Sequence, residues 1–170
     1  MKAIKLVNNR DGKSVTPKTY LKYWLDKNFL FFYFEALDSS LNSFSNINND
    51  SLYKGDVVEV FLDLGEEHYY EFEVAPNGAT FVAKILNGTL IFIENNFFVS
   101  KVEAINSNYY VTMRIDLSKL AVVDEIKFNA FRIETKRIKP EYILEALSPT
   151  FTGSFHDRNK FIKIENYRCD

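Results

Sequence analysis

The chain has 170 residues, with 21 Lys and Arg against 23 Asp and Glu, and a formal net charge of -2. This balance argues against a nucleic-acid partner, because nucleic-acid binding usually needs a basic surface. The basic run Lys136–Lys139 is typical of a solvated loop. No apolar run reaches 18 residues, so we expect no transmembrane helix and no membrane partner. The length favours a single domain over residues 1–170.

The compartment depends on whether the chain begins at its native start. The segment Met1–Asn9 lacks the apolar core of a secretion signal. We therefore expect a cytoplasmic protein if this start is native, and an extracellular one if a signal has been removed. The single cysteine, Cys169, allows no disulfide within the chain.

Strand-sized segments begin with a predicted hairpin. The 16 Phe and 10 Tyr of the chain suit strands better than helices. Tyr20–Leu25 and Phe29–Leu37 are such segments, and Asp26–Asn28 separates them as a turn. The Asn-rich run Leu41–Asp50 follows and is typical of a long exposed loop.

The next two predicted strands carry an acidic face. In Asp56–Asp63, side-chain alternation places Glu59 and Asp63 on the face opposite Val58, Val60 and Leu62. In Tyr69–Val74, the same alternation separates Glu71 and Glu73 from the apolar residues. If the strands pair, one sheet face carries at least four carboxylates. Such a face is either solvated surface or a polar binding groove, because burying unpartnered carboxylates is costly.

Two Asn-Gly pairs, at residues 77–78 and 87–88, predict tight hairpin turns. They bracket a predicted strand at Thr80–Leu86 and lead into another at Thr89–Ile93. Asp116 is a plausible N-cap for a short helical turn that ends at Leu120. The remaining predicted strands are Phe98–Ile105, Tyr109–Ile115, Ile126–Glu134, Tyr142–Leu147 and Phe161–Glu165.

About ten short strands with at most one or two helical turns indicate an all-β fold. The spacing favours an antiparallel β-sandwich or jelly roll over a parallel α/β sheet. Several segments in order resemble the family 9 carbohydrate-binding modules and the related DOMON-type sandwiches. The segments that carry this resemblance are Phe29–Asp38, Tyr53–Asp63, Tyr70–Ala79, Tyr110–Leu120, Phe128–Glu134, Leu147–Thr150 and Phe155-His156 with Phe161.

The resemblance implies a sugar clamp, in which two tryptophans sandwich a sugar unit while charged side chains bind its hydroxyls. Tyr53 occupies the position of the first tryptophan, and Glu59 and Arg132 match charged residues of the family site. Glu59 and Arg132 would form either a hydroxyl-binding pair or a structural ion pair across the sheet. Side-chain alternation also places Arg114 on the polar face, where it could neutralise Glu71 or Glu73.

One wall of this clamp is missing from the sequence. The second tryptophan is expected near Ala146–Pro149, where none occurs, and Tyr142 or Phe151 could replace it. The only tryptophan, Trp24, lies in an early strand where the family has no ligand contact.

The resemblance also implies structural calcium bound by loop oxygens, and the oxygen-rich loops are Asp38–Asp50 and Asn8–Gly12. Zinc is disfavoured because His68 and His156 lie far apart in the sequence and have no supporting cysteine. We expect His68 to be exposed and His156 to belong to a packing motif.

These observations favour a non-catalytic domain whose partner is a carbohydrate. The main alternative is a sandwich that has lost ligand binding and serves a structural or interaction role. A jelly-roll glycoside hydrolase would have to use Glu59, Asp63 and Glu67, whose spacing of four differs from the every-second-residue pattern of such enzymes. A DOMON-like haem module would need Met113 or a histidine as axial ligand.

Overall fold

The computed structural model describes residues 2–38, 40–123, 125–135 and 142–165, and every structural statement below refers to these residues. Cys169 and the basic run 136–139 lie outside them. Within the described ranges, no helix has the length and hydropathy needed to cross a membrane.

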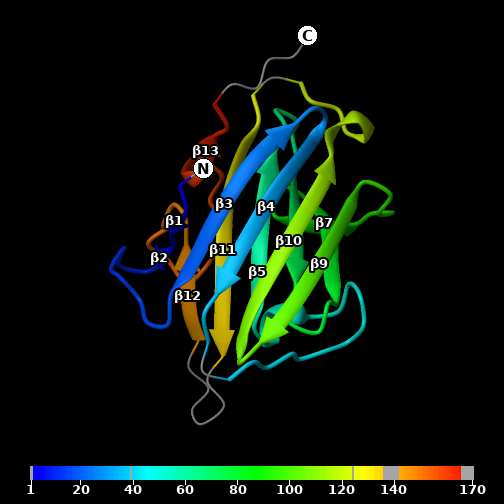
Figure 1. The fold of residues 1–170 in the computed structure, drawn as a ribbon. Helices are drawn as coiled ribbons and strands as arrows, with labels where there is room; N and C mark the ends of the chain where they lie inside the picture. The colour runs from blue at the N-terminus through cyan, green and yellow to red at the C-terminus, as the bar shows by residue number, and fades with distance from the viewer. Residues whose placement is uncertain (1, 39, 124, 136–141, 166–170) are drawn as a thin grey trace.

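Two antiparallel sheets face each other as a sandwich (Figure 1). The five-stranded sheet contains, in spatial order, β1 (Ile4–Lys5), β3 (Thr19–Asp26), β4 (Phe29–Ala36), β10 (Asn108–Asp116) and β9 (Phe98–Ile105). The eight-stranded sheet contains β2 (Val7–Asn8), β12 (Tyr142–Ala146), β11 (Lys127–Thr135), β5 (Val57–Asp63), β6 (Tyr69–Val74), β7 (Thr80–Leu86) and β8 (Thr89–Phe92), with β13 (Ile162–Lys163) paired to β11.

The predicted fold class is therefore confirmed, with more and shorter elements than expected. The additional strands β1, β2 and β13 have two residues each. The three described helices are 3-10 turns of three residues: η1 (Leu52–Lys54), η2 (Leu117–Lys119) and η3 (Arg158–Lys160). Asp116 caps η2 as predicted, because its carboxylate accepts the Ser118 N–H at 3.1 Å.

The main core lies between the sheets and follows from side-chain alternation. Every second residue of β4 and β5 enters it, and the same holds for β6 and β10. Its largest members are aromatic: Phe32, Phe34, Phe72, Phe128 and Tyr109.

A second apolar cluster covers the outer face of the eight-stranded sheet. It includes Phe61 from β5, Phe131 from β11 and Phe81 from β7. Phe155 and Phe161, which follow β12 in the chain, pack onto these rings. Strands β5 and β11 are thus buried on both faces, so the usual alternation of buried and exposed residues does not show in their sequence.

The Asn-rich loop is anchored to the sheet, although the sequence predicted a long exposed loop. Asn49 donates its N–H to Thr80 O at 2.9 Å, and its side-chain oxygen accepts the Val82 N–H at 2.9 Å. Gly55 lets the same loop approach closely, because a Cβ there would lie 2.5 Å from Phe44 N. The loop therefore covers the first half of the β7 edge and places η1 beside the sheet.

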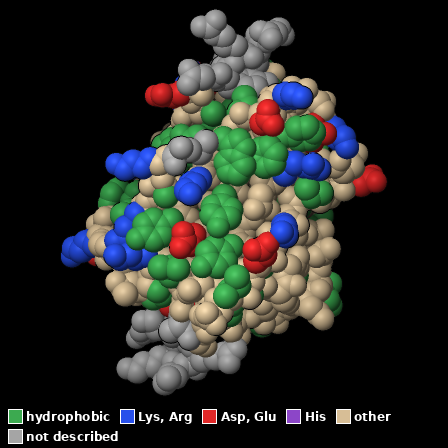
Figure 2. Space-filling view, viewed as in Figure 1, with side chains coloured by type: hydrophobic (Ala, Val, Ile, Leu, Met, Phe, Trp, Pro, Cys, Tyr) green, Lys and Arg blue, Asp and Glu red, His purple; other side chains and the backbone are tan. Residues whose placement is uncertain are grey.

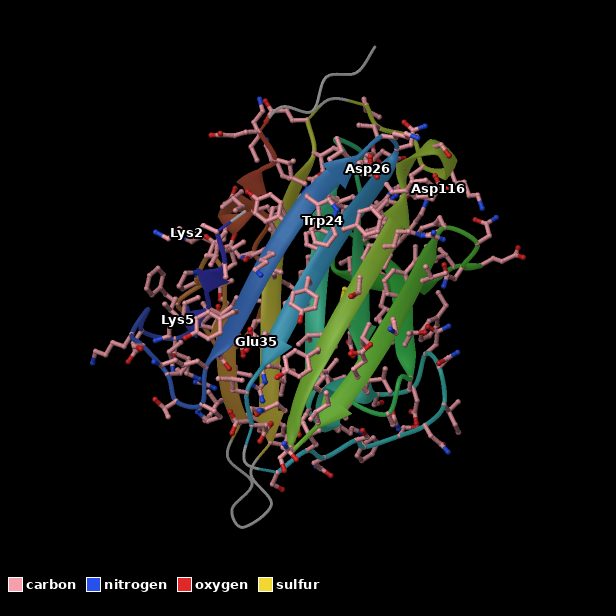
Figure 3. All side chains as sticks on the ribbon, viewed as in Figure 1. Lys2, Lys5, Trp24, Asp26, Glu35 and Asp116 are labelled. Atoms are coloured by element: carbon pink, nitrogen blue, oxygen red, sulfur yellow. The ribbon has the colours of Figure 1, made fainter. Side chains whose placement is uncertain are left out.

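The outer face of the five-stranded sheet carries aromatic and charged side chains together (Figure 2). Trp24 of β3 stacks on Phe31 of β4, with ring centroids 4.9 Å apart and planes 4° from parallel. Trp24 and Glu35 lie on this face (Figure 3). The cavity described next opens on the other sheet.

Candidate functional site

Three glutamates form the floor of the candidate site on the outer face of the eight-stranded sheet. Glu59 of β5 lies directly opposite Glu73 of β6, and Phe61 lies opposite Glu71. One carboxylate oxygen from each of the three glutamates lies within 4.8 Å of the others. The alternation predicted for these two strands is thus confirmed, and it makes the three side chains converge.

The glutamate floor is buried rather than solvated. Glu59 and Glu73 are each 2% exposed, and Glu71 is 6% exposed. Burial raises the pKa of Glu59 well above its ordinary value, and the charges of Glu73 and Glu71 add to the effect. Burial also raises the pKa of Glu71 to about 7 and that of Glu73 to about 9. The floor therefore retains protons at neutral pH.

Two carboxylate oxygens of the floor have no hydrogen-bond donor among the described residues outside the floor itself, where Glu73 and Glu71 share a hydrogen bond. They are Oε2 of Glu71 and Oε2 of Glu73, and both are fully buried. A buried acceptor without a donor costs free energy, which a ligand with N–H or O–H groups can recover.

The fourth predicted carboxylate belongs to a structural ion pair. Arg158 of η3 contacts both carboxylate oxygens of Asp63, each at 2.7 Å. Burial acts to raise the pKa of Asp63, but the hydrogen bonds and charge of Arg158 lower it overall. Asp63 thus anchors η3 to the end of β5 and is not part of the floor.

A cavity of about 470 Å³ lies over the three glutamates. Its lining residues are Asn49, Asp50, Ser51, Tyr53, Glu59, Phe61, Glu71, Glu73, Phe81, Leu90, Phe92, Ile133, Leu144, Gly153, Ser154, Phe155 and His156. The lining contains no Lys or Arg. Its charged groups are acidic, and its remaining walls are mainly aromatic and aliphatic.

Tyr53 and Phe92 are the exposed aromatic rings of the cavity wall. Tyr53, in η1, is 50% exposed, and Phe92, in the edge strand β8, is 57% exposed. The Phe92 ring packs edge-on against Phe81, with centroids 5.5 Å apart. The position predicted for Tyr53 beside the site is thus observed, whereas sequence reasoning missed Phe92.

The second wall comes from a different segment than predicted. Leu144, Phe155 and His156 line the cavity, whereas Tyr142 and Phe151 do not. Phe155 stacks on Phe131 with centroids 4.2 Å apart, so its ring is fixed in place. The sequence signal for this wall is the Phe155-His156 pair, for which the sequence predicts packing alone.

His156 does pack as predicted, and it also faces the cavity. Its ring stacks on Phe61 at 5.0 Å, and its Nδ1 lies 2.7 Å from the Tyr69 hydroxyl. Burial lowers the pKa of His156, which keeps the imidazole neutral at neutral pH. His68 is partly buried rather than exposed, and it lies beside Glu66 and Tyr70.

A buried asparagine holds the loop that carries Phe155. Asn9 is fully buried, and its side-chain oxygen accepts the Thr150 N–H at 2.9 Å. Its amide group donates to Thr150 Oγ1 at 2.9 Å and to Thr152 O at 3.1 Å. Thr150 Oγ1 in turn donates to Ser154 O at 2.6 Å. This network joins the N-terminal segment to the cavity wall.

Arg132 does not pair with Glu59, so the prediction of that pair is wrong. On β11, Phe131 lies opposite Glu59, and the next residue, Arg132, points between the sheets. Its guanidinium binds Asp38 Oδ2 at 2.5 Å and lies 3.7 Å from Glu145. Side-chain alternation thus places Arg132 on the opposite side of the sheet from the cavity.

Arg114 is also remote from the cavity. It lies on β10 of the five-stranded sheet, where its guanidinium stacks over the Phe29 ring at 5.0 Å. The predicted neutralisation of Glu71 or Glu73 by Arg114 is therefore wrong. Sequence alternation identified the correct strand face, but it could not tell which of the two sheets the strand joins.

The loops expected to bind calcium do not gather a ligand set among the described residues. Asp38 binds Arg132, and Asp50 accepts the Ser51 N–H at 2.7 Å. In the other loop, Asp11 accepts the Lys13 N–H at 2.9 Å. These oxygens already have protein partners, and calcium in these loops stays a prediction.

Comparison with solved structures gives the class of fold. The sequence itself matches no family model and no curated protein. A candidate carbohydrate-binding protein from Bacteroides uniformis superposes with a TM-score of 0.75 at 14% identity, over 94% of this chain and 83% of that chain. The fold is thus shared with that protein despite low sequence identity.

Two further structures identify the fold more narrowly. They are a family 9 carbohydrate-binding module from Caldicellulosiruptor kristjanssonii in complex with cellotriose and with glucose, at TM-scores of 0.61 and 0.62. Each is 20% identical over 85% of this chain, and the match covers 73% and 74% of the module. The chain therefore has the fold of the family 9 carbohydrate-binding modules. The resemblance to DOMON-type domains stays a prediction.

Proposed function

We propose that this chain is a non-catalytic carbohydrate-binding domain that takes a sugar in the cavity above Glu59, Glu71 and Glu73. The single observation that carries the proposal is the pairing of buried carboxylates with exposed aromatic rings in one cavity. Aromatic rings stack on the C–H faces of pyranoses, and carboxylates accept hydrogen bonds from hydroxyl groups.

The cavity has a suitable size and character. Small-molecule sites commonly span about 300–1,000 Å³ and combine apolar walls with a few polar groups. The volume of about 470 Å³ falls in this range. A pyranose between Tyr53 and Phe92 would place its hydroxyls over the glutamate floor.

The comparisons support the same class of ligand. The modules from C. kristjanssonii were solved with glucose and with cellotriose. The aromatic clamp that the family resemblance implies would have its counterpart here in Tyr53 on one side and in Phe92 or Phe155 on the other. This counterpart also argues against a sandwich that has lost its ligand site.

Calorimetric titration with glucose, xylose, glucosamine and cellotriose tests the proposal. We expect saturable binding that Tyr53→Ala and Phe92→Ala each weaken by about tenfold, the effect of losing roughly 1.4 kcal/mol of stacking. Tyr142→Ala is the matched control, because Tyr142 is 51% exposed and lies outside the cavity lining. Failure of all four sugars to bind, or equal losses in all three variants, would contradict the proposal.

A glycoside hydrolase is the second candidate, and the glutamate floor is the observation that favours it. Retaining glycosidases use two carboxyl groups about 5–5.5 Å apart, one of them with a raised pKa. The predicted trio of Glu59, Asp63 and Glu67 is ruled out, because Asp63 pairs with Arg158. Glu59 and Glu73 could supply the chemistry instead. Release of nitrophenol from aryl glycosides that is lost in Glu73→Gln would establish an enzyme, and we expect no release.

A further inference from the structure

The charge of the cavity is unbalanced. Three glutamates converge on its floor, and Asp50 adds a fourth acidic group to the lining. Arg158 of η3 is engaged with Asp63, and Lys54, whose ammonium lies 6.0 Å from the Tyr53 ring centroid, is outside the lining. With a neutral sugar the floor would stay partly protonated, whereas a cationic ligand would supply a counter-charge that lets its carboxyl groups ionise.

The geometry of the floor suits an ammonium group. An ammonium has three N–H donors, and the floor offers one oxygen from each of three carboxylates within 4.8 Å. Oε2 of Glu71 and Oε2 of Glu73 are buried, and the only donor within reach among the described residues is a carboxyl proton of the floor itself. A single –NH₃⁺ group can satisfy such acceptors through charge-assisted hydrogen bonds, which are stronger than neutral ones.

The walls favour an organic cation over a metal ion. Calcium takes six to eight oxygen ligands, and a metal held by three glutamates would keep several waters. Those waters would lie against the apolar part of the lining, which includes Phe61, Phe81 and Leu144. Aromatic rings form favourable contacts with sugar C–H groups and with organic cations, so these walls suit such a ligand better than a hydrated metal ion.

We propose that the ligand of this cavity is an amino sugar with a free, protonated amine, and that its ammonium group binds Glu59, Glu71 and Glu73. The inference rests on the proposed function of the same cavity. The pyranose ring would contact Tyr53 and Phe92, so the glutamate floor would select the substituent and the walls would hold the ring.

The test compares sugars that differ only at one carbon. Glucosamine, N-acetylglucosamine and glucose are titrated calorimetrically into the protein, as are the β-1,4-linked trimers of each. We expect the free amines to bind at least about tenfold more tightly than their acetylated and hydroxyl counterparts at low salt, in line with a charge-assisted contact. Equal affinity for glucose and glucosamine would overturn the inference and leave sugar binding intact. No binding by any sugar would remove the proposed function itself.

Substitutions in the floor test whether the preference for the amine depends on these glutamates. Glu73→Gln conserves shape and removes one charge, so we expect it to abolish the preference for the amine while the protein stays folded by thermal melting. Glu71→Gln provides a second variant should the first unfold. Glu103→Gln is the control, because it makes the same charge change at an exposed position of the other sheet. An unchanged amine preference in both floor variants would overturn the inference.

A further titration tests whether a metal ion occupies the glutamate floor. Calcium chloride alone is titrated into the protein, and glucosamine binding is repeated with and without chelator. We expect neither treatment to change glucosamine affinity by more than about twofold, since mobile ions screen a buried contact only weakly. Calcium binding that displaces glucosamine and disappears in Glu73→Gln would assign the floor to a metal ion and overturn the inference.

Discussion

Glu59 and Glu73 occupy directly opposite positions on β5 and β6, and both side chains point to the outer face although each is 2% exposed. Like charges in opposite positions of an antiparallel pair are destabilising. The structure tolerates them because raised pKa values keep part of the cluster protonated. The pair therefore links the stability of the sheet to pH.

We expect the protein to lose stability as the pH rises from about 5 to about 9. A carboxyl group with a folded pKa above its unfolded value stabilises the fold below the unfolded pKa, and this stability is lost as the pH passes the folded pKa. For Glu73 that window runs from 4.5 to about 9. Each proton involved contributes at most about 1.4 kcal/mol per pH unit. Urea unfolding at several pH values measures the slope.

The Glu73→Gln variant separates the contribution of Glu73 to the pH dependence of stability from the contributions of other buried acids. Burial also raises the pKa of Glu134 and Glu145 to about 7, and both act in the same direction. We expect the variant to show a shallower decline than the unmodified protein, while Glu103→Gln shows the same decline. Parallel stability curves for all three proteins would show that the floor does not hold protons.

Binding of an amino sugar should release protons. An ammonium group stabilises the ionised form of the glutamates, so their pKa values fall on binding and protons leave the floor. Titrations near pH 6 in two buffers with different ionisation heats measure the number released. We expect about one proton per amino sugar, given the raised pKa values of Glu71 and Glu73. A neutral sugar should release fewer, and equal release by both would contradict the predicted contact.

Arg132→Met should destabilise the fold strongly. The guanidinium is fully buried and binds Asp38, with Glu145 and Glu134 nearby. Its removal leaves buried carboxylates without a cation, which commonly costs about 3–5 kcal/mol. Urea unfolding measures the loss. Wild-type stability combined with weakened sugar binding would return Arg132 to the ligand-binding role that the sequence predicted.

Asn9→Ala should loosen the wall that carries Phe155. The substitution leaves the buried Thr150 N–H without its acceptor, which costs about 1–3 kcal/mol. We expect weaker sugar binding as well, because Thr150 holds the loop through Ser154 O. Asn8→Ala is the control, since the Asn8 side chain accepts only the exposed Arg10 N–H. Lower stability with unchanged affinity would show that the loop position does not affect the site.

Local patterns in the sequence predicted most strands and the acidic face, because alternation is a property of each strand alone. The placement of Arg132 at the site, which rested on the family resemblance, was wrong. The neighbours of Arg132, Phe131 and Ile133, are apolar because a later loop covers them, so the apolar side of β11 does not mark the interior. Phe92 was missed for a related reason. Its role depends on β8 being the edge strand beside the cavity. The alternation of side chains within a strand does not predict the order of strands in a sheet.

The three glutamates come from one tight β5–β6 pair, whereas the rings around them come from η1, the edge strand β8 and a loop after β12. Loops and edges tolerate insertion and exchange far better than paired central strands. In the proposed site, the peripheral segments that would contact the sugar ring can therefore be altered without disturbing the glutamates that would bind the ammonium group. We therefore expect recognition of charge and recognition of ring shape to be separable by engineering in the proposed site.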